Sequence, residues 1–376
     1  MTRVAFRPGM QALVRILFIT AVASSLLANT GFAQPTNHLT GLQWRPADGL
    51  RIEGKGWSDT KSFYDRLPAT AENTVRKNVW NLGRDSSGIC IRFLTDATNI
   101  AARWTVRKDA LGMPHMPPSG VSGLDLYLKE KGEWRWVGNA RPFTKSDEKY
   151  LVKSMKPGRR EYALYLPLYN GIEELSIGVD ESAALETAPA RIAKPVVFYG
   201  TSILQGGCAS RPGMAYPAIL GRRLDWPTIN LGFSGNAHCE PEVARLLAEL
   251  DPAVYVLDPL PNMTAQMVAE RLERFVQIIR KARPNTPIIF VEHVDYTDGE
   301  FVPSRKERVA GDNAKLKETY DGLLKSGQKK LFYVPNAKLF GADGEATVDG
   351  THPTDLGFLR MADAIEPTLR KALKAK

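Results

Sequence analysis

The periodicity of the sequence changes near residue 190, and this change constrains the fold more than any other feature. From about Leu42 to Val179, short apolar and β-branched runs are separated by Gly, Pro, Asn and Asp, with no long helical pattern. Such runs predict an all-β sandwich, jelly-roll-like in type. The expected strands are Gly88–Phe93, Ile100–Val106, Leu124–Leu128, Trp134–Val137, Tyr162–Leu166 and Glu174–Val179.

Beyond about Pro189, strands that look buried alternate with amphipathic helices. Apolar residues recur at helical spacing in Val268–Ile279 and again in Phe358–Leu369. This alternation predicts an α/β fold, with parallel strands joined by crossovers that cover both faces of the sheet. The expected strands are Val196–Tyr199, Thr228–Leu231, Ala253–Leu257, Ile288–Glu292 and Leu331–Val334.

The two patterns predict two domains that meet in the Ala184–Pro195 stretch, which has little periodicity of its own. We assign residues 40–185 to the β-sandwich and residues 190–376 to the α/β domain. A chain of 376 residues is long enough for each domain to bury a core.

The first 33 residues have the three-part pattern of a secretory signal peptide. Basic residues precede an apolar run from Ile16 to Ala28, and the small residues Gly31 and Ala33 precede a cut before Gln34. The apolar run is about 13 residues long, shorter than the ~20 that a membrane-spanning helix needs. We expect an exported protein, periplasmic or secreted, without stable membrane insertion after signal cleavage.

Charge and motif content narrow the classes of partner. The formal net charge of +9 is spread along the chain, and no segment resembles a nucleic-acid-binding module, so we expect no nucleic-acid partner. His238, Cys239 and Glu240 are consecutive, and consecutive residues rarely bind one ion. The sequence contains neither His-Glu-x-x-His nor Cys-x-x-Cys. We therefore expect no metal and no other cofactor.

Three cysteines, Cys90, Cys208 and Cys239, permit one disulfide in an oxidising compartment. Cys208 lies six residues after Ser202, and Cys239 lies four after Gly235. If both of these loops border one site, Cys208 and Cys239 are the natural pair.

Polar residues gather where the predicted parallel strands end. In a doubly wound sheet, ligands bind beyond the carboxyl ends of the strands. A hydroxyl, a glycine loop, an amide and an Asp-x-x-His pair could therefore meet in one crevice. They belong to Gly200–Ile203 (GTSI), Asn230–Asn236 (NLGFSGN), Asp258–Asn262 (DPLPN) and Asp349–Pro353 (DGTHP).

These residue types fit acyl transfer by a serine nucleophile. The Ser202 hydroxyl needs a base, and His352 can take its proton. Asp349, three residues before His352, can orient the imidazole and stabilise its transient charge. The backbone N–H groups of Ser202 and Gly235 and the side-chain amide of Asn262 can donate to the oxyanion of the tetrahedral intermediate.

The four segments resemble the conserved blocks of the SGNH, or GDSL, hydrolases, which are named after a Ser, a Gly, an Asn and a His. Ser202, Gly235, Asn262 and His352 match these four positions, and Asp349 matches the triad Asp of the family pattern. The resemblance implies a catalytic triad of Ser202, Asp349 and His352. It also implies a flavodoxin-like three-layer hydrolase domain that follows the β-sandwich in the sequence.

The resemblance sharpens to a subgroup with an amino-terminal β-sandwich of the GxDLY type. It rests on Ser122–Tyr127 (SGLDLY), Tyr165–Gly178 (YLPLYNGIEELSIG) and Tyr199–Tyr216 (YGTSILQGGCASRPGMAY), and it covers the chain from about Leu42. Two blocks depart from the family pattern. Gly-Thr-Ser-Ile replaces Gly-Asp-Ser-Leu, and Leu-Pro-Asn-Met replaces Gly-x-Asn-Asp. Both departures retain the catalytic Ser and Asn.

The resemblance implies a serine esterase that removes small acyl groups, above all acetyl, from an acylated polysaccharide or glycan. Three alternatives stay open. The first is a lipid or aryl esterase, or a thioesterase, with the same triad. The second is a glycan acetyltransferase. The third is a carbohydrate-binding protein whose hydrolase domain is inert.

Other polar residues receive weaker interpretations. Ser234 is a rival hydroxyl, but it lacks the Gly-x-Ser-x-Gly elbow of another hydrolase class. Arg211 either contacts the substrate or packs at the rim. His293 either touches the substrate or simply ends a strand, and His115 is expected on the surface.

Overall fold

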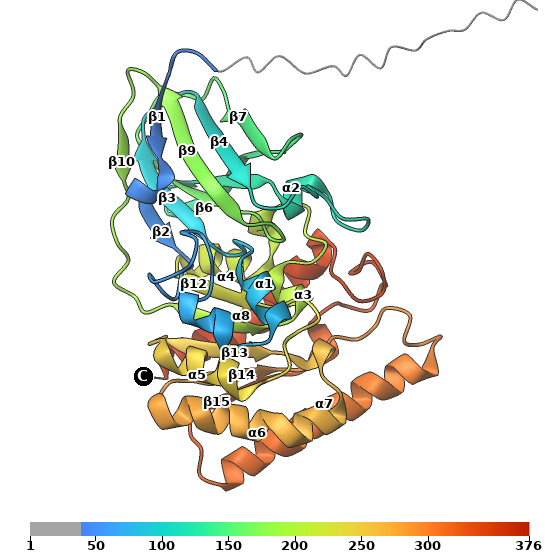
Figure 1. Ribbon diagram of the computed structural model, residues 1–376. Helices are drawn as coiled ribbons and strands as arrows, with labels where there is room; N and C mark the ends of the chain where they lie inside the picture. Colours follow the sequence, from blue (N-terminus) through green and yellow to red (C-terminus); the bar gives the residue numbers. More distant parts are fainter. Residues whose placement is uncertain (1–38, 376) are drawn as a thin grey trace, which may run out of the picture. The chain divides into compact units, whose positions relative to one another are not determined.

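The computed structural model describes residues 39–375 of the chain (Figure 1). These residues form two antiparallel sheets and one parallel sheet, together with several helices. The predicted signal peptide, residues 1–33, lies outside the described residues. None of the described helices is long and apolar enough to cross a membrane.

The first half of the chain forms the two antiparallel sheets. Their strands are β1 (Leu42–Pro46), β2 (Arg51–Glu53), β3 (Cys90–Thr95), β4 (Ile100–Val106), β5 (Leu124–Glu130), β6 (Glu133–Ala140), β7 (Ser146–Val152), β8 (Arg160–Tyr165), β9 (Ile172–Asp180) and β10 (Leu185–Thr187). One sheet has the order β1-β9-β4-β7, and the other has the order β10-β3-β8-β5-β6, with β2 paired to β3. This is the strand order of a jelly roll, so the predicted sandwich is confirmed.

The core of the sandwich follows from the period of two along each strand. Alternate residues of β3 and β4, such as Phe93, Ile100 and Trp104, are fully buried together with Leu126 and Ile177 from the neighbouring strands. Each such side chain contributes about 1.5–3 kcal/mol by leaving water.

The second half of the chain forms the parallel sheet and its helices. Its strands are β11 (Val196–Gly200), β12 (Thr228–Gly232), β13 (Val254–Asp258), β14 (Ile288–Val291) and β15 (Leu331–Val334). The order β12-β11-β13-β14-β15, parallel throughout, is that of a doubly wound sheet with a switch point beside β11. The predicted flavodoxin-like arrangement is confirmed.

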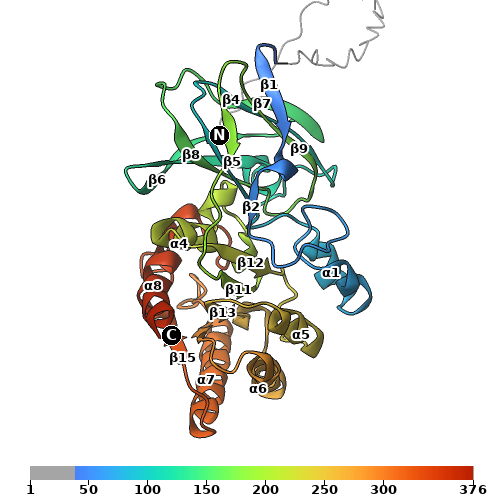
Figure 2. The same cartoon turned by 90° about the vertical axis from the view of Figure 1, so that its left-hand side faces the viewer.

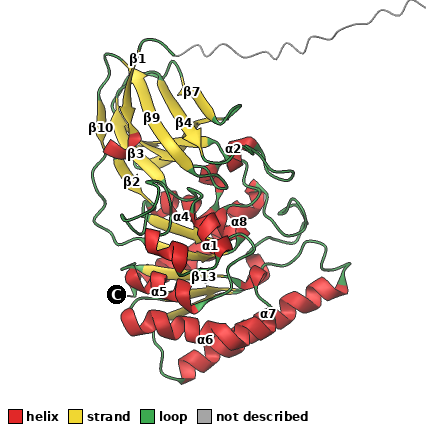
Figure 3. Ribbon diagram, viewed as in Figure 1, coloured by secondary structure: helices red, strands yellow, loops and turns green. Residues whose placement is uncertain are grey.

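Helices cover both faces of this sheet (Figures 1–3). The α-helices are α1 (Lys77–Gly83), α2 (Pro118–Val121), α3 (Ser202–Gln205), α4 (Tyr216–Leu224), α5 (Pro241–Glu249), α6 (Ala265–Ala282), α7 (Pro303–Lys325) and α8 (Asp355–Lys374), with 3-10 turns at Ala47–Gly49, Ala69–Asn73, Pro212–Met214, Leu260–Asn262 and Asn336–Lys338. α5, α6 and α7 pack on one face of the sheet. α4 and α8 pack on the other.

The two halves share a core as well as a boundary. Val79 and Trp80 of α1, from the first half, are buried against the α5 and α6 side of the parallel sheet. Arg66 is 1% exposed and donates hydrogen bonds to the carbonyl oxygens of Asn230 and Gly232 on β12, both at 2.9 Å. A buried guanidinium with these acceptors fixes the first half to the edge of the sheet. The domain limits at residues 40–185 and 190–376 remain predictions.

Candidate active site

Ser202 is placed by the turn that joins β11 to α3. Thr201 caps the short helix, its side-chain oxygen accepting from the backbone N–H of Ile203 at 3.2 Å. Gly200 passes so close to β13 that a Cβ there would stand 2.5 Å from the carbonyl oxygen of Asp258. The turn therefore presents Ser202 at the carboxyl end of β11, next to the central strand β13.

Asp349 and His352 come from the loop that precedes α8. Oδ1 of Asp349 accepts from the backbone N–H of His352 at 2.8 Å and from that of Thr351 at 3.0 Å, which closes the turn. Oδ2 of Asp349 lies 2.8 Å from Nδ1 of His352. Partial burial raises the pKa of Asp349, but the hydrogen bonds from His352 and Thr351 outweigh it, so the net pKa lies below its usual range. The carboxyl is thus an anion at neutral pH.

Hydrogen bonds connect the side chains of Ser202, His352 and Asp349 in series, although Ser202 and His352 are 150 residues apart. Nε2 of His352 lies 2.9 Å from Oγ of Ser202, while Nδ1 faces Asp349. In this arrangement the imidazole can accept the hydroxyl proton on one nitrogen and keep its other N–H on the carboxylate.

The predicted oxyanion donors lie on neighbouring strand ends. Gly235 has a φ of +66°, a left-handed conformation in which glycine is unstrained. Oδ1 of Asn262 accepts from the backbone N–H of Ala237 at 3.3 Å, which ties the amide to the Gly235 loop. Its Nδ2 group donates to no acceptor within residues 39–375 and is free to donate to a ligand. That these groups converge on one oxyanion stays a prediction.

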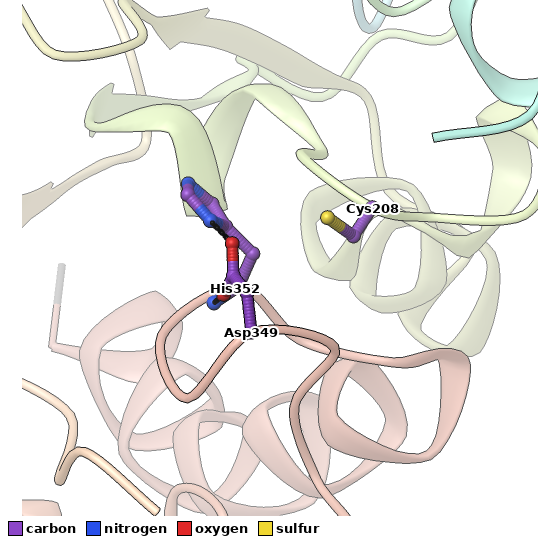
Figure 4. Close-up of side chains that lie close together, drawn as sticks. All are labelled: Cys208, Asp349 and His352. Atoms are coloured by element: carbon purple, nitrogen blue, oxygen red, sulfur yellow. Dashed lines mark hydrogen bonds and ion pairs between the residues drawn. The ribbon is translucent and has the colours of Figure 1, made fainter. Parts of the chain in front are cut away.

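The expected disulfide between Cys208 and Cys239 is wrong, because all three cysteines lie within the described residues and all are free. The two loops lead to helices on opposite faces of the sheet. Cys239 precedes α5 and is buried in the core of that face. Cys208 precedes α4, and its sulfur points toward Asp349 and His352 (Figure 4). Burial, with a contribution from Asp349, raises the pKa of the Cys208 thiol to about 12.

Among residues 39–375, one group of three side chains could hold a metal ion, and it lies at this site. Atoms of Cys208, Asp349 and His352 that could bind an ion lie within 4.8 Å of one another. Two of these residues are already engaged in the hydrogen-bonded line to Ser202. The expectation that the site needs no metal remains a prediction.

The weaker candidates fall into structural positions. Arg211 donates to Oδ2 of Asp125 at 2.8 Å and packs against the first half of the chain. His293 is fully buried, with Nδ1 2.6 Å from the carbonyl oxygen of Val294, and burial lowers its pKa to about 4. The backbone N–H of Ser234 donates to Gln205 at 3.0 Å, and no hydrogen bond joins Ser234 to His352.

Two neighbours of the site were not identified from the sequence as such. His115, from the segment between β4 and α2, is exposed, and its ring centroid lies 5.8 Å from that of His352. The hydroxyl of Tyr169 donates to the carbonyl oxygen of Ser202 at 3.1 Å. Both residues come from the first half of the chain. No local signal indicates their position, because only the packing of the two halves creates it.

Family models match both halves of the chain. Residues 193–370 match the GDSL-like lipase/acylhydrolase family, and residues 42–185 match the GxDLY model, the N-terminus of SGNH-hydrolase-type esterases. No curated protein matches the chain.

Solved structures match over nearly the whole described chain. A GDSL-like lipase from Bacteroides ovatus ATCC 8483 is 37% identical, with a TM-score of 0.85, and the match covers 89% of this chain and 98% of that one. A salicylyl-acyltransferase from a tetracycline biosynthetic pathway is 20% identical, with a TM-score of 0.71 and the same coverage. An acetyl xylan esterase from Butyrivibrio proteoclasticus is 12% identical, with a TM-score of 0.55 over 89% and 99% of the two chains. The last two matches show the fold alone.

Proposed function

Because the chain belongs to the family of GDSL-like lipases and acylhydrolases, we propose that it is an exported serine esterase with Ser202 as its nucleophile. Its substrates are small acyl esters, above all O-acetyl groups, on a carbohydrate polymer. His352 is the general base and Asp349 its orienting partner. The observation that carries the proposal is the hydrogen-bonded line from Ser202 through His352 to Asp349.

In the first step, Oγ of Ser202 attacks the carbonyl carbon of the ester while Nε2 of His352 takes the hydroxyl proton. The carbonyl oxygen becomes an oxyanion, to which the N–H groups of Ser202 and Gly235 and the Asn262 amide donate. As the intermediate collapses, the bond to the alcohol breaks and the alcohol leaves with the proton from His352. The acyl group stays on Ser202.

In the second step, His352 takes a proton from water, and the resulting hydroxide attacks the acyl carbon. The bond to Oγ breaks, the acid is released, and Ser202 recovers its proton from His352. The imidazolium that forms in each step faces the Asp349 carboxylate at 2.8 Å. This pairing favours the charged ring at the moment when catalysis creates it.

A carbohydrate substrate is supported by three independent features. Solved carbohydrate esterases share the fold, among them the acetyl xylan esterase. The signal-like N-terminal segment directs the protein to compartments that contain polysaccharides. The loop from Gln205 to Gly213 that follows the nucleophile is rich in glycine and polar residues, unlike the apolar wall that a long acyl chain needs.

A second candidate function is acyl transfer to an alcohol instead of water. The fold similarity to the salicylyl-acyltransferase favours it, since that similarity exceeds the one to the acetyl xylan esterase. Product analysis separates the two functions. An esterase releases free acid when an alcohol acceptor is present, whereas a transferase gives mainly the new ester.

The direct test is acetate release by the purified protein from acetylated xylan, glucomannan and pectin, with Ser202→Ala as the paired control. The proposal expects release from at least one polymer and a loss of about 10⁴-fold or more in the variant. Cleavage of 4-nitrophenyl acetate without release from any polymer would keep the serine mechanism and reject the carbohydrate substrate. No cleavage of any ester would reject the enzyme proposal.

A further inference from the structure

A cavity of about 430 Å³ lies beside the candidate active site, and most of its wall comes from the first half of the chain. Asn78 and Asn81 of α1 line it, as do Met113 and Tyr169. Ser234, from the glycine loop after β12, completes the wall together with Asn236. The cavity therefore lies where the two halves of the chain meet.

The cavity is close to the proposed nucleophile. Tyr169 lines it and also donates to the carbonyl oxygen of Ser202 at 3.1 Å. At Gly207, a Cβ would stand 3.0 Å from the Tyr169 hydroxyl and 3.1 Å from Cδ2 of His352, so this hydroxyl and the imidazole both lie next to Gly207. Ser234 and Asn236 flank Gly235, the proposed oxyanion donor. A molecule held in the cavity would thus lie beside the loops that carry Ser202 and Gly235.

Two side-chain amides on the wall are available to a ligand. Asn78 and Asn81 are three residues apart on α1, so they share one face of the helix. Both are exposed, and neither carboxamide has a hydrogen-bonding partner within residues 39–375. Each amide offers two donors and an acceptor, a combination that suits hydroxyl groups, which both donate and accept.

The rest of the wall is mainly apolar and carries no free charge. Leu82, Met113 and Tyr169 provide apolar surface. Lys108 also lines the cavity, but its amino group lies 2.6 Å from the Asp85 carboxylate and donates to the carbonyl oxygen of Tyr169 at 2.8 Å. Amides beside an apolar surface match a sugar ring, which has hydroxyl groups around its edge and C–H bonds on its faces. Because Lys108 is already paired with Asp85, its charge gives the cavity no preference for an acidic ligand.

We propose that this cavity binds the neutral sugar unit that carries the ester, with Asn78 and Asn81 as the residues that recognise its hydroxyl groups. The inference rests on the proposed esterase function and gives the first half of the chain a direct part in substrate choice. Asn78 and Asn81 bind the alcohol part of the substrate and take no part in the chemical steps.

The test is the double variant Asn78→Ala/Asn81→Ala, with Lys77→Ala on the same helix as the matched control. Kinetics are measured with partially acetylated oligosaccharides of xylan, glucomannan and pectin, and with 4-nitrophenyl acetate, which has no sugar. Losing two hydrogen bonds to a sugar predicts a KM for the best oligosaccharide that is higher by about 5- to 100-fold. We expect the kcat/KM for 4-nitrophenyl acetate to change less than about twofold, as in Lys77→Ala for both substrates.

Three outcomes would overturn the inference. The first is an unchanged KM for the oligosaccharide in the double variant. The second is an equal loss with both substrates, which would indicate general damage to the site. The third is an altered preference for acyl chain length, tested with 4-nitrophenyl acetate, butyrate and octanoate, which would place the acyl group in the cavity.

Binding measurements separate this inference from the proposed function. Isothermal titration of the Ser202→Ala protein with the deacetylated oligosaccharides measures sugar binding without catalysis. Binding that is lost in Ser202→Ala/Asn78→Ala/Asn81→Ala supports the cavity even if no ester is cleaved. Hydrolysis of oligosaccharides together with unchanged binding in the triple variant would reject the cavity and keep the esterase.

Discussion

The two halves of this chain serve the active site in different ways. The second half supplies the proposed reactive groups, since Ser202, Asp349 and His352 all lie in polar loops outside the strands of the parallel sheet. The first half supplies buried anchors. Asp125 of β5, which is completely buried, accepts from the backbone N–H of Gly213 at 2.8 Å. The comparison teaches that local motifs can indicate candidate reactive residues, whereas the shape of the site depends on contacts between distant parts of the chain.

The largest expected effect tests the second half of the chain, which carries the proposed triad. In Asp349→Asn, the amide can no longer hold the imidazole with its N–H toward an anion, so kcat for 4-nitrophenyl acetate should fall by about 10³- to 10⁴-fold. Because Asp349 is exposed, the thermal midpoint should change little. A variant that retains more than a tenth of the activity would show that Asp349 does not orient His352.

The next largest effect tests the first half of the chain, which supplies the buried anchor Asp125. Asp125→Ala leaves the half-buried Arg211 without its carboxylate and the Gly213 N–H without its acceptor. The free energy of unfolding should fall by about 3–5 kcal/mol in urea denaturation. Glu174→Ala, at an exposed position on β9, is the control and should stay within about 0.5 kcal/mol of the natural protein. Equal stability of the two variants would show that Asp125 does not act as an anchor between the two halves.

A somewhat smaller effect tests the oxyanion donors. Asn262→Ala removes the free Nδ2 group and should lower kcat by about 10²- to 10³-fold, while KM for 4-nitrophenyl acetate changes little. Asn262→Asp, which replaces the donor with an acceptor, should be at least as severe. A loss that appears only in KM would assign Asn262 to substrate binding.

The smallest effect contrasts two of the buried carboxyl groups, those of Asp125 and Asp258. Within residues 39–375, Asp125 has several donors, whereas Asp258 accepts only from Tyr216 at 2.9 Å, and its Oδ1 is buried without a partner. Burial raises the pKa of Asp258 from 3.8 to about 7. Between these values the folded protein keeps a proton that the unfolded chain has lost, so stability falls as pH rises.

This pH effect can be measured by urea denaturation. The loss should be about 2 kcal/mol between pH 5 and pH 7, and Asp258→Asn should remove it. If the variant retains the whole pH dependence, the titrating group lies elsewhere in the molecule.

Much of the fold could be predicted from the sequence, because strand and helix periodicity reflects burial directly. The weakest segments are those with little apolar patterning. β7 (SDEKYLV) is an edge strand with mostly polar side chains, so its sequence lacks the alternation that marks β3 or β4. α7 spans 23 residues but buries only Val309, Leu316 and Leu323 among its apolar side chains. Neither was expected from the pattern.

The proposed reactive residues could be located from the sequence, but their surroundings could not. Ser202 and His352 stand in short motifs at strand and loop ends, so the family pattern identifies them. The hydrogen bond from Gly213 to Asp125 joins residues 88 positions apart, and no local signal indicates it. The wrong disulfide has the same origin. Sequence spacing places Cys208 and Cys239 near the site. Only the direction of each crossover shows that the two cysteines precede helices on opposite faces of the sheet.

The central claim is that Ser202 is the nucleophile, and covalent labelling tests it most directly. The folded protein is treated with a fluorophosphonate, whose fluoride is displaced by an activated serine oxygen, and the labelled peptide is identified by mass spectrometry. The account predicts one phosphonylated residue, Ser202, with activity lost in proportion to labelling and no adduct in His352→Ala. Labelling of Ser234 instead, or complete inactivation without an adduct on Ser202, would contradict it.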